Sequence, residues 1–276
     1  MSGVDLHTHT TASDGTYSPA ELVREAVRRG VRVLAITDHD STEAIAPALA
    51  VAREHPPLEI VAGIEINTDV AGAEVHALGY FVDHTAEWFL ARLREFREER
   101  AARVTRITDR LAELGLPVDP AEVFALVREG SAGRPHIAQV MVQRGYVGSV
   151  KEAFDRYLRA GGPAYVSHRK VNPREACTLI HRAGGVAAMA HPGFHEAAAE
   201  RLVRELAGER LLEGIECYYA EHTRQQTARF LALCRELDLV PTGGSDFHGP
   251  TVRAATLGQP SVPWAAWEAL RRRAGR

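Results

Sequence analysis

Residues 4–14 read VDLHTHTTASD, and the fold can be worked out from this stretch. The short apolar run at 4–7 has the composition of a strand, and His7 and His9 stand two residues apart at its end. Side chains two residues apart on a strand project from the same face, so both imidazoles can reach one metal ion. On its own, such a pair is more often two histidines at the edge of a core.

Six more strand-like runs follow, and they alternate with helical patterns at both ends of the chain. They are VRVLAIT at 31–37, LEIVAGIEI at 58–66, EVHALGYFV at 74–82, GVAAMA at 185–190, LEGIECYY at 212–219 and LVPTGG at 239–244. This alternation favours a parallel barrel or a doubly wound sheet. Residues 18–21 (SPAE) and 172–175 (NPRE) are helix starts, because each has a capping residue, a proline and then a glutamate.

A hairpin is predicted around Asp69-Val70-Ala71-Gly72. Counting outward symmetrically from that turn places Glu65 directly opposite His76. Those two side chains could then share one ion.

The middle of the chain lacks strand signals between about residues 87 and 162. It becomes a long Arg/Glu-rich helix followed by shorter helices at 120–129, 135–144 and 149–160, and the break Gly161-Gly162-Pro163 ends this section. We therefore expect a barrel formed by residues 1–86 and 163–276, with residues 87–162 as a helical insertion that forms a lid.

The composition is that of an ordinary globular protein, with 276 residues, 45% of them hydrophobic and 25% charged. The net charge of -3 excludes a global basic field for non-specific nucleic-acid binding. The chain has no apolar stretch near the roughly 18 residues of a membrane span. The N-terminal sequence does not resemble a signal peptide, so we expect a cytoplasmic location.

The three cysteines, Cys177, Cys217 and Cys234, are odd in number and show no CxxC spacing. We expect them to be reduced thiols of the core, with no role in catalysis or zinc binding.

Residues that ligate metals occur at nearly every predicted strand end. They are His7, His9, Asp14, His39, Glu65, His76, His191, Asp246 and His248. Because strand ends converge on one face of a barrel, we expect these nine donors to form one site. Asp38 and Asp40 flank His39 and are expected to orient imidazoles, although Asp40 could equally cap a helix.

Histidine and carboxylate without cysteine favour catalytic manganese, iron or zinc over structural zinc, magnesium or calcium. Nine donors exceed the needs of one ion, so we expect two or three divalent ions, with manganese first. Such a site would carry more positive charge than its three carboxylates cancel. It would attract an anionic substrate and acidify bound water, which makes phosphate ester hydrolysis the natural reaction.

The nine residues and their order resemble the PHP (polymerase and histidinol phosphatase) family of metallophosphoesterases, whose pattern is HxH, Asp, His, Glu, His, His and DxH. Residues 133–138, GRPHIA, resemble the subgroup that hydrolyses nucleoside 3′,5′-bisphosphates and trims short RNA from its 5′ end. The resemblance implies an α/β fold, a distorted (β/α)7 TIM-like barrel with a helical insertion. It also implies removal of the 3′-phosphate from substrates such as adenosine 3′,5′-bisphosphate, with 5′-3′ exonuclease action on short RNA as a further activity.

The family pattern further implies three ion sites that share the nine donors. The first would use His7, His9, Glu65 and Asp246, the second Glu65, His76 and His191, and the third Asp14, His39 and His248. Glu65 would then be the bridging carboxylate and a catalytic residue.

Three further residues are expected to act on the substrate. Arg134 and His136 would bind a phosphate group from the lid, because a guanidinium fork matches phosphate geometry. The alternative is that Arg134 is a solvated loop residue and that Pro135-His136 only begins a helix. His195 is the candidate proton donor to the leaving group, whereas residues 168–170 and His222 are expected to be peripheral.

Other interpretations of the sequence have specific weaknesses. Many amidohydrolase barrels bridge two metals with a carboxylated strand lysine, but Lys151 lies in the insertion and Lys170 in a loop. Histidinol-phosphate hydrolysis fits the GRPHIA segment less well, and a metal-binding structural or regulatory module fits the intact ligands less well. The expected partners are a nucleotide and short single-stranded RNA, with no membrane and no obligate protein partner.

Overall fold

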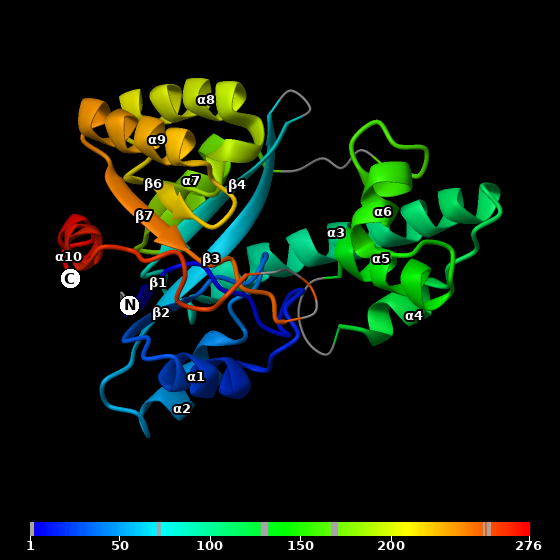
Figure 1. The fold of residues 1–276 in the computed structure, drawn as a ribbon, viewed down its shortest axis with the longest axis horizontal. Coiled ribbons are helices and arrows are strands. Elements are labelled where there is room, and N and C mark those ends of the chain that lie inside the picture. The colour runs from blue at the N-terminus through cyan, green and yellow to red at the C-terminus, as the bar shows by residue number, and fades with distance from the viewer. Residues whose placement is uncertain (1–2, 71–72, 128–131, 167–170, 251, 253–254) are drawn as a thin grey trace.

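The computed structural model describes residues 3–70, 73–127, 132–166, 171–250, 252 and 255–276 (Figure 1). Within these residues, seven strands form one sheet in chain order. They are β1 (Val4–Asp5), β2 (Val33–Ile36), β3 (Glu59–Val70), β4 (Ala73–Tyr80), β5 (Val186–Met189), β6 (Gly214–Tyr219) and β7 (Val240–Gly244). Each of them overlaps a strand-like run of the sequence.

The sheet curls into a nearly closed barrel. The Leu6 N–H donates to the carbonyl of Gly243 over 3.2 Å, and the Asp246 N–H donates to the carbonyl of His7 over 2.8 Å. The chain after β1 therefore runs beside the end of β7 and the loop after that strand. This confirms the distorted seven-stranded β/α barrel.

Strand β4 runs opposite to the other strands. It is antiparallel to both β3 and β5, whereas the remaining neighbours in the sheet are parallel. The beginning of β4 therefore lies at the barrel end where the other strands finish. This direction brings His76, near the start of β4, to the same end as the other predicted ligands.

The predicted register of the β3–β4 hairpin is wrong. Asn67 pairs with His76, and Glu65 pairs with Leu78. Val70 already pairs with Ala73, so the turn is centred one residue later than expected, and every pair shifts by two; residues 71–72 lie outside the described residues. Glu65 and His76 are instead diagonal neighbours on one face, within reach of each other.

Helices pack around the barrel and across its floor. These are α1 (Pro19–Arg28), α2 (Ile45–Ala52), α7 (Pro173–Arg182), α8 (Glu196–Gly208), α9 (Arg224–Leu237) and α10 (Trp264–Arg273). Trp267 of α10 shares an apolar cluster with Val4, Val33 and Val240 at the beginnings of their strands, so α10 closes the end of the barrel opposite His76.

The predicted helix starts are confirmed. The Ser18 hydroxyl accepts from the Glu21 N–H over 3.3 Å, and the Glu21 carboxylate accepts from the Ser18 N–H over 2.8 Å, which completes a capping box. Asn172 accepts in the same way from the N–H of Glu175 over 2.9 Å.

The described elements between residues 87 and 158 are all helical. They are α3 (Glu87–Glu113), α4 (Pro120–Ala125), α5 (Arg134–Gln143), α6 (Val150–Ala153) and the π-helical turn η1 (Phe154–Leu158). Phe89 and Leu93 of α3 pack into a barrel cluster, whereas Ile107 and Leu111 belong to a second cluster formed with α4 to η1. Helix α3 runs from the barrel to the group formed by α4, α5 and α6 (Figure 1). Among the described residues, no helix is both long and apolar enough to cross a membrane.

The three cysteines are buried and form no disulfide, as expected for core thiols. The Sγ atoms of Cys217 and Cys234 lie 3.5 Å apart, between β6 and α9.

Candidate metal centre

The nine predicted ligands meet at one end of the barrel, and their side chains are buried or nearly so. They form overlapping groups whose ligand atoms lie within 4.8 Å of one another: His9, Asp14, His39 and His248; His7, Glu65 and His191; His7, His9 and Asp246; and His39, Glu65 and His76. The groups do not divide in the way that the family pattern implies, because His9 joins the Asp14 group, His191 groups with His7 and Glu65, and His76 groups with His39 and Glu65. The three ion sites therefore stay a prediction.

Glu65 lies at the middle of the cluster, and its two oxygens face different partners. Its Oε2 lies 3.3 Å from His7 Nε2, 3.2 Å from His9 Nε2 and 3.0 Å from His39 Nδ1. Its Oε1 lies 2.8 Å from His76 Nδ1 and 3.0 Å from His191 Nε2. A carboxylate placed in this way can serve two cations, one through each oxygen.

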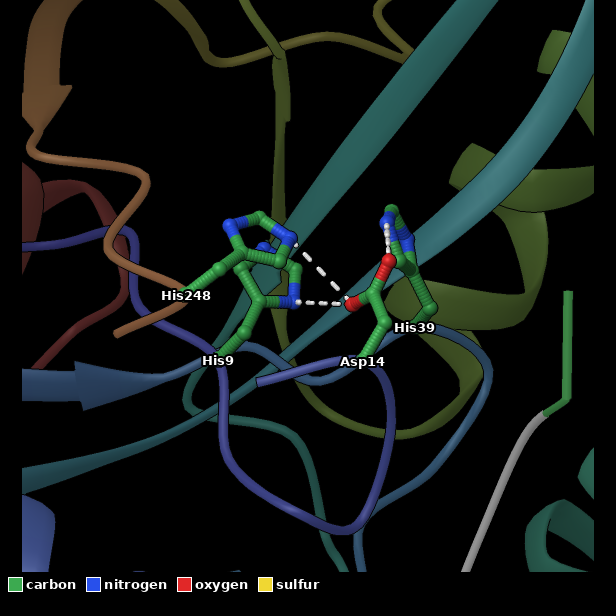
Figure 2. Close-up of side chains that lie close together, drawn as sticks. All are labelled: His9, Asp14, His39 and His248. Carbon is green, nitrogen blue, oxygen red and sulfur yellow. Dashed lines mark ion pairs between the residues drawn. The ribbon is translucent and has the colours of Figure 1, made fainter. Parts of the chain in front are cut away.

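Asp14 lies close to the imidazoles of His9, His39 and His248 (Figure 2). Its Oδ1 lies 3.2 Å from His248 Nε2 and 3.7 Å from His9 Nδ1, and its Oδ2 lies 3.8 Å from His39 Nε2. Although it is buried, Oδ1 has no hydrogen-bond partner of good geometry. A buried carboxylate oxygen left in this way is costly unless a cation satisfies it, so the donor set fits a metal.

The HxH pair gives a second observation in favour of a metal. His7 Nε2 and His9 Nε2 approach to 3.1 Å, and both lie 3.2–3.4 Å from Asp246 Oδ1. Two imidazole nitrogens and a carboxylate oxygen thus converge on one point, which is the arrangement that a divalent cation requires.

Burial and charge set the ionisation of the carboxylates. Burial alone would raise the pKa of Glu65 and of Asp14, but the neighbouring imidazoles outweigh it and hold both pKa values well below the usual range. His39 has the largest such effect on Glu65, and His248 on Asp14. Both carboxylates are therefore ionised and able to bind cations.

The histidines divide into two groups by pKa. Burial lowers the pKa of His39 well below its usual value, although the charges of Glu65 and Asp14 act in the opposite direction. Burial opposes protonation of His7 and His9 as well, but nearby carboxylates outweigh it, raising the pKa of His7 well above normal and that of His9 to about 9. Metal binding at these two residues must therefore displace protons.

Glu216, in β6, supports two of the ligands and was not singled out from the sequence. His7 Nδ1 lies 2.9 Å from its Oε1, and the N–H of His191 donates to its Oε2 over 2.8 Å. His191 has a positive φ of 23°, which is a strained conformation for a residue with a side chain. The hydrogen bond from its N–H to Glu216 stabilises the backbone in this conformation. The signal in the sequence was a carboxylate inside an otherwise apolar and aromatic strand run.

Asp38 is connected to the ligand His9 through Ser13. Its carboxylate accepts from the Thr10 N–H over 2.7 Å and from the Ser13 hydroxyl over 2.6 Å, and Ser13 Oγ lies 3.3 Å from His9 Nδ1. The expected role in orienting an imidazole is thus indirect.

The alternative of a helix cap at Asp40 is wrong, because α2 begins after Ala44 without a side-chain cap. The Asp40 carboxylate instead accepts from Arg100 Nη1 of α3 over 2.9 Å and from Asn67 Nδ2 over 3.0 Å. Asn67 Nδ2 in turn lies 3.3 Å from His39 Nδ1. Asp40 therefore connects the helical section to a candidate metal ligand.

His136 of α5 lies beside the cluster. A cavity of about 290 Å³ separates α5 from the loop after β1, and His136, Gln139, Asp14 and Thr16 are among the residues that line it. Burial lowers the pKa of His136, and its Nδ1 accepts from the Gly133 N–H over 3.2 Å. The segment GRPHIA thus lines the same cavity as the candidate metal ligand Asp14.

Arg134 opens α5 and contacts neighbouring parts of the chain. Its Nη1 donates to the carbonyl of Leu158 over 3.3 Å, and its guanidinium lies 5.6 Å from the centre of the Phe154 ring and 6.0 Å from that of Tyr165. These contacts hold the guanidinium between the first turn of α5 and the segment 154–165.

His195 ends the short 3-10 helix η2 (Pro192–His195) and is exposed. Among the described residues, no hydrogen bond or ion pair joins it to the nine ligands. His222 accepts from the Gly193 N–H over 3.1 Å, and its Nδ1 lies 3.2 Å from the Cys217 carbonyl oxygen. Residues 168–170 lie outside the described residues.

Comparison with known proteins gives a consistent result. The PHP domain family matches residues 5–166. The 5'-3' exoribonuclease Rnm of Escherichia coli K12 is 35% identical over 249 residues, which are 89% of this chain and 85% of the relative. The 3',5'-nucleoside bisphosphate phosphatase of Chromobacterium violaceum is 32% identical over 257 residues, which are 91% and 88% of the two chains. A crystal structure described as a metal-dependent phosphoesterase, from Bifidobacterium adolescentis, aligns with a TM-score of 0.88 and 30% identity over 98% of this chain and 95% of that one.

Proposed function

This chain belongs to the PHP domain family and is a metal-dependent phosphoester hydrolase, and from that premise we propose that it removes the 3′-phosphate from nucleoside 3′,5′-bisphosphates. Adenosine 3′,5′-bisphosphate would yield adenosine 5′-monophosphate. The observation that carries the proposal is the cavity lined both by His136 of the GRPHIA segment and by the candidate ligand Asp14. It gives a phosphorylated substrate a place beside the ligand cluster.

We propose two or three divalent ions, manganese first and iron or zinc as alternatives, held by the nine residues. When bound, these ions would supply an activated water and positive charge for the phosphoryl oxygens. Glu65 would keep two ion positions at a fixed separation, because each of its oxygens faces a different set of imidazoles. Glu216 would keep His7 turned with Nε2 toward the cluster.

The two ends of the substrate would be held by different parts of the chain. Arg134 and His136 would bind the 5′-phosphate from α5, while the 3′-phosphate lies over the ligand cluster. His195, exposed at the end of the turn that follows His191, would give a proton to the leaving 3′-oxygen. The cytoplasm remains the predicted location.

Short 5′-phosphorylated RNA is a second candidate substrate, favoured by the 35% identical relative named as an exoribonuclease. The same geometry would treat a 3′-phosphate and a 3′,5′-diester alike, because only the continuation of the leaving group differs. The net charge of -3 excludes a long basic track, so extended or duplex nucleic acid should bind poorly.

The substrate proposal is tested with a panel of manganese-loaded turnover assays. The panel contains adenosine 3′,5′-bisphosphate, adenosine 3′-monophosphate, a short 5′-phosphorylated RNA, histidinol phosphate and an aryl phosphate. Preference for the two 5′-phosphorylated substrates is the expected result. Equal use of the compounds with and without a 5′-phosphate, or preference for histidinol phosphate, would refute the assignment.

Arg134→Ala tests the anchor within the same assays. It should weaken kcat/KM for 5′-phosphorylated substrates by about 1.5 to 3 kcal/mol, the scale of a charged hydrogen bond, and leave the aryl phosphate nearly unchanged. Arg144→Ala is the matched control, since Arg144 follows the same helix and pairs with Glu122 at the surface. Equal losses on both kinds of substrate would show that Arg134 supports the fold or the ligand cluster instead.

Elemental analysis tests the metal proposal independently of turnover. Protein purified without chelators should contain two or three divalent ions per chain. Full activity with one ion or fewer after manganese reloading would exclude the multinuclear site.

A further inference from the structure

Phe194 is an aromatic side chain that the folded chain leaves exposed beside the ligand cluster. Its relative exposure is 47%, the largest among the large hydrophobic residues that the structure describes as exposed. Its ring centre lies 5.2 Å from that of His191, and 5.7 Å from that of Tyr219, which it meets edge-on at 81°. The hydroxyl of Tyr219 donates to Asp246 over 2.9 Å, so both ring neighbours of Phe194 belong to or contact the cluster.

The backbone that carries Phe194 is fixed. The Gly193 N–H donates to His222 Nε2 over 3.1 Å, and Gln226 Nε2 donates to the Gly193 carbonyl over 3.1 Å. A Cβ at Gly193 would approach the His222 ring to 2.5 Å, so the turn is packed closely against α9 and the loop between β6 and α9. Phe194 is therefore held in place before any ligand arrives.

Phe194 also stands at a side from which the cluster can be reached. The side chains of His39, His76 and His191 are 10–13% exposed, whereas those of His7, His9, Asp246 and His248 are at most 4% exposed. His39, His76 and His191 thus form an accessible side of the cluster in addition to the cavity beside Asp14, and the Phe194 ring contacts His191.

We propose that the exposed face of Phe194 is the platform on which the nucleobase of the substrate stacks. The inference rests on the proposed function and extends it by naming the part of the chain that recognises the base. A rigid aromatic ring next to the reacting phosphate gives a base a flat apolar partner, and every base has a π-face to offer. The four common nucleosides should therefore be accepted with little discrimination.

The test compares adenosine 3′,5′-bisphosphate with the abasic ribose 3,5-bisphosphate, using the manganese-loaded enzyme. The variants are Phe194→Ala, Phe194→Tyr and the matched control Trp264→Ala, since Trp264 is the other exposed aromatic residue among those described and stacks on Arg32 at the start of α10. The wild-type enzyme should prefer the base-bearing substrate by about 5- to 100-fold in kcat/KM, the range expected for one stacked base. Phe194→Ala should remove this preference, while Phe194→Tyr and Trp264→Ala keep it.

Calorimetric binding of adenosine 5′-monophosphate and ribose 5-phosphate provides a readout that does not depend on turnover, and the same loss of preference is expected there. An equal decrease on both substrates in Phe194→Ala, with lower metal content, would overturn the platform and assign the ring to support of His191. Equal use of both substrates by the wild-type enzyme would also overturn it. A wild-type enzyme that hydrolyses neither substrate but does hydrolyse other phosphate esters would instead refute the proposed function, and the platform with it.

Discussion

At the scale of single residues, Glu65 faces five imidazoles, with at least two of them at each of its oxygens. Oε2 faces His7, His9 and His39, and Oε1 faces His76 and His191. Removing its charge should therefore disturb two ion positions together, whereas removing one imidazole should disturb one.

Glu65→Gln should lower kcat by at least about a hundredfold, or about 2.7 kcal/mol, and reduce the metal content. His76→Asn, which removes a ligand at the accessible side, is the control and should lose less. The measurement is turnover of a phosphate ester together with elemental analysis. Near-normal turnover and metal content in Glu65→Gln would contradict a bridging role.

Glu216→Gln should weaken metal affinity by about 10- to 100-fold, the usual effect of removing the partner of a ligating histidine. The amide cannot supply the negative charge that holds His7 in the required orientation. Glu213→Gln is the matched control, because Glu213 lies on the same segment but its carboxylate faces His181. Titration with manganese, followed calorimetrically, should separate the two variants, and equal affinities would show that Glu216 only fills the barrel interior.

Some residues of the cluster could be identified from the sequence, and others could not. Seven of the nine donors could be located because they follow a recognisable strand, and Glu65 and His76 lie within the two strands of the predicted hairpin. Glu216 and Tyr219 could not be paired with their partners, because His7 and Glu216 are separated by 209 positions and only the barrel brings them together. A contact of that kind has no local pattern in the sequence.

At the scale of elements, the β3–β4 hairpin shows what local pattern determines. Its two strands were predicted from apolar runs and its turn from Asp69-Val70-Ala71-Gly72, but its register depends on the centre of the turn. A turn centred one residue later moved Glu65 from His76 to Leu78. The side chains still meet, because a shift of two keeps both on the same face of the sheet.

The contact between α7 and the turn before β6 makes stability depend on pH. His181 Nε2 lies 3.0 Å from Glu213 Oε2, and this hydrogen bond raises the pKa of His181. A raised pKa means that the ion pair stabilises the fold fully below the unfolded value of about 6.5 and that this contribution is lost as the pH rises through the folded pKa.

His181→Asn should therefore lower the free energy of unfolding by about 0.5 kcal/mol at pH 5.5, because the pair is partly exposed, and by less at pH 9. Denaturant unfolding at the two pH values measures the difference. A loss that is equal at both, or larger at pH 9, would show that packing of the ring matters more than its charge.

At the scale of the whole molecule, the ligand cluster holds the mouth of the barrel together. Its residues come from β3 and β4 and from the segments after β1, β2, β5 and β7. The barrel architecture was predictable from strand and helix alternation. A lid carrying Arg134 and His136 near the ligands was expected from the sequence, but the particular ligand that shares a cavity with His136, Asp14, depends on how α3 leaves the barrel.

Metal binding should accordingly stabilise the entire fold. At a manganese concentration 100 times the Kd, the free energy of unfolding should rise by about 2.7 kcal/mol per site, and a chelator should remove this gain. Thermal unfolding with manganese and with a chelator provides the measurement, and Glu65→Gln should show a smaller shift. A Tm that does not respond to manganese in the wild-type protein would contradict a site built from the folded strands.

Because the ligand cluster joins residues that follow the first and the last strand, it cannot form until nearly the whole chain has been synthesised. His7 and His9 are synthesised roughly 240 residues before Asp246 and His248. At about 5 to 20 residues per second, the histidine pair leaves the ribosome on the order of 10 to 50 s before its carboxylate partner exists. The cluster is therefore assembled only after translation has passed β7, and a nascent chain stalled before that strand would carry the histidines without the centre they complete.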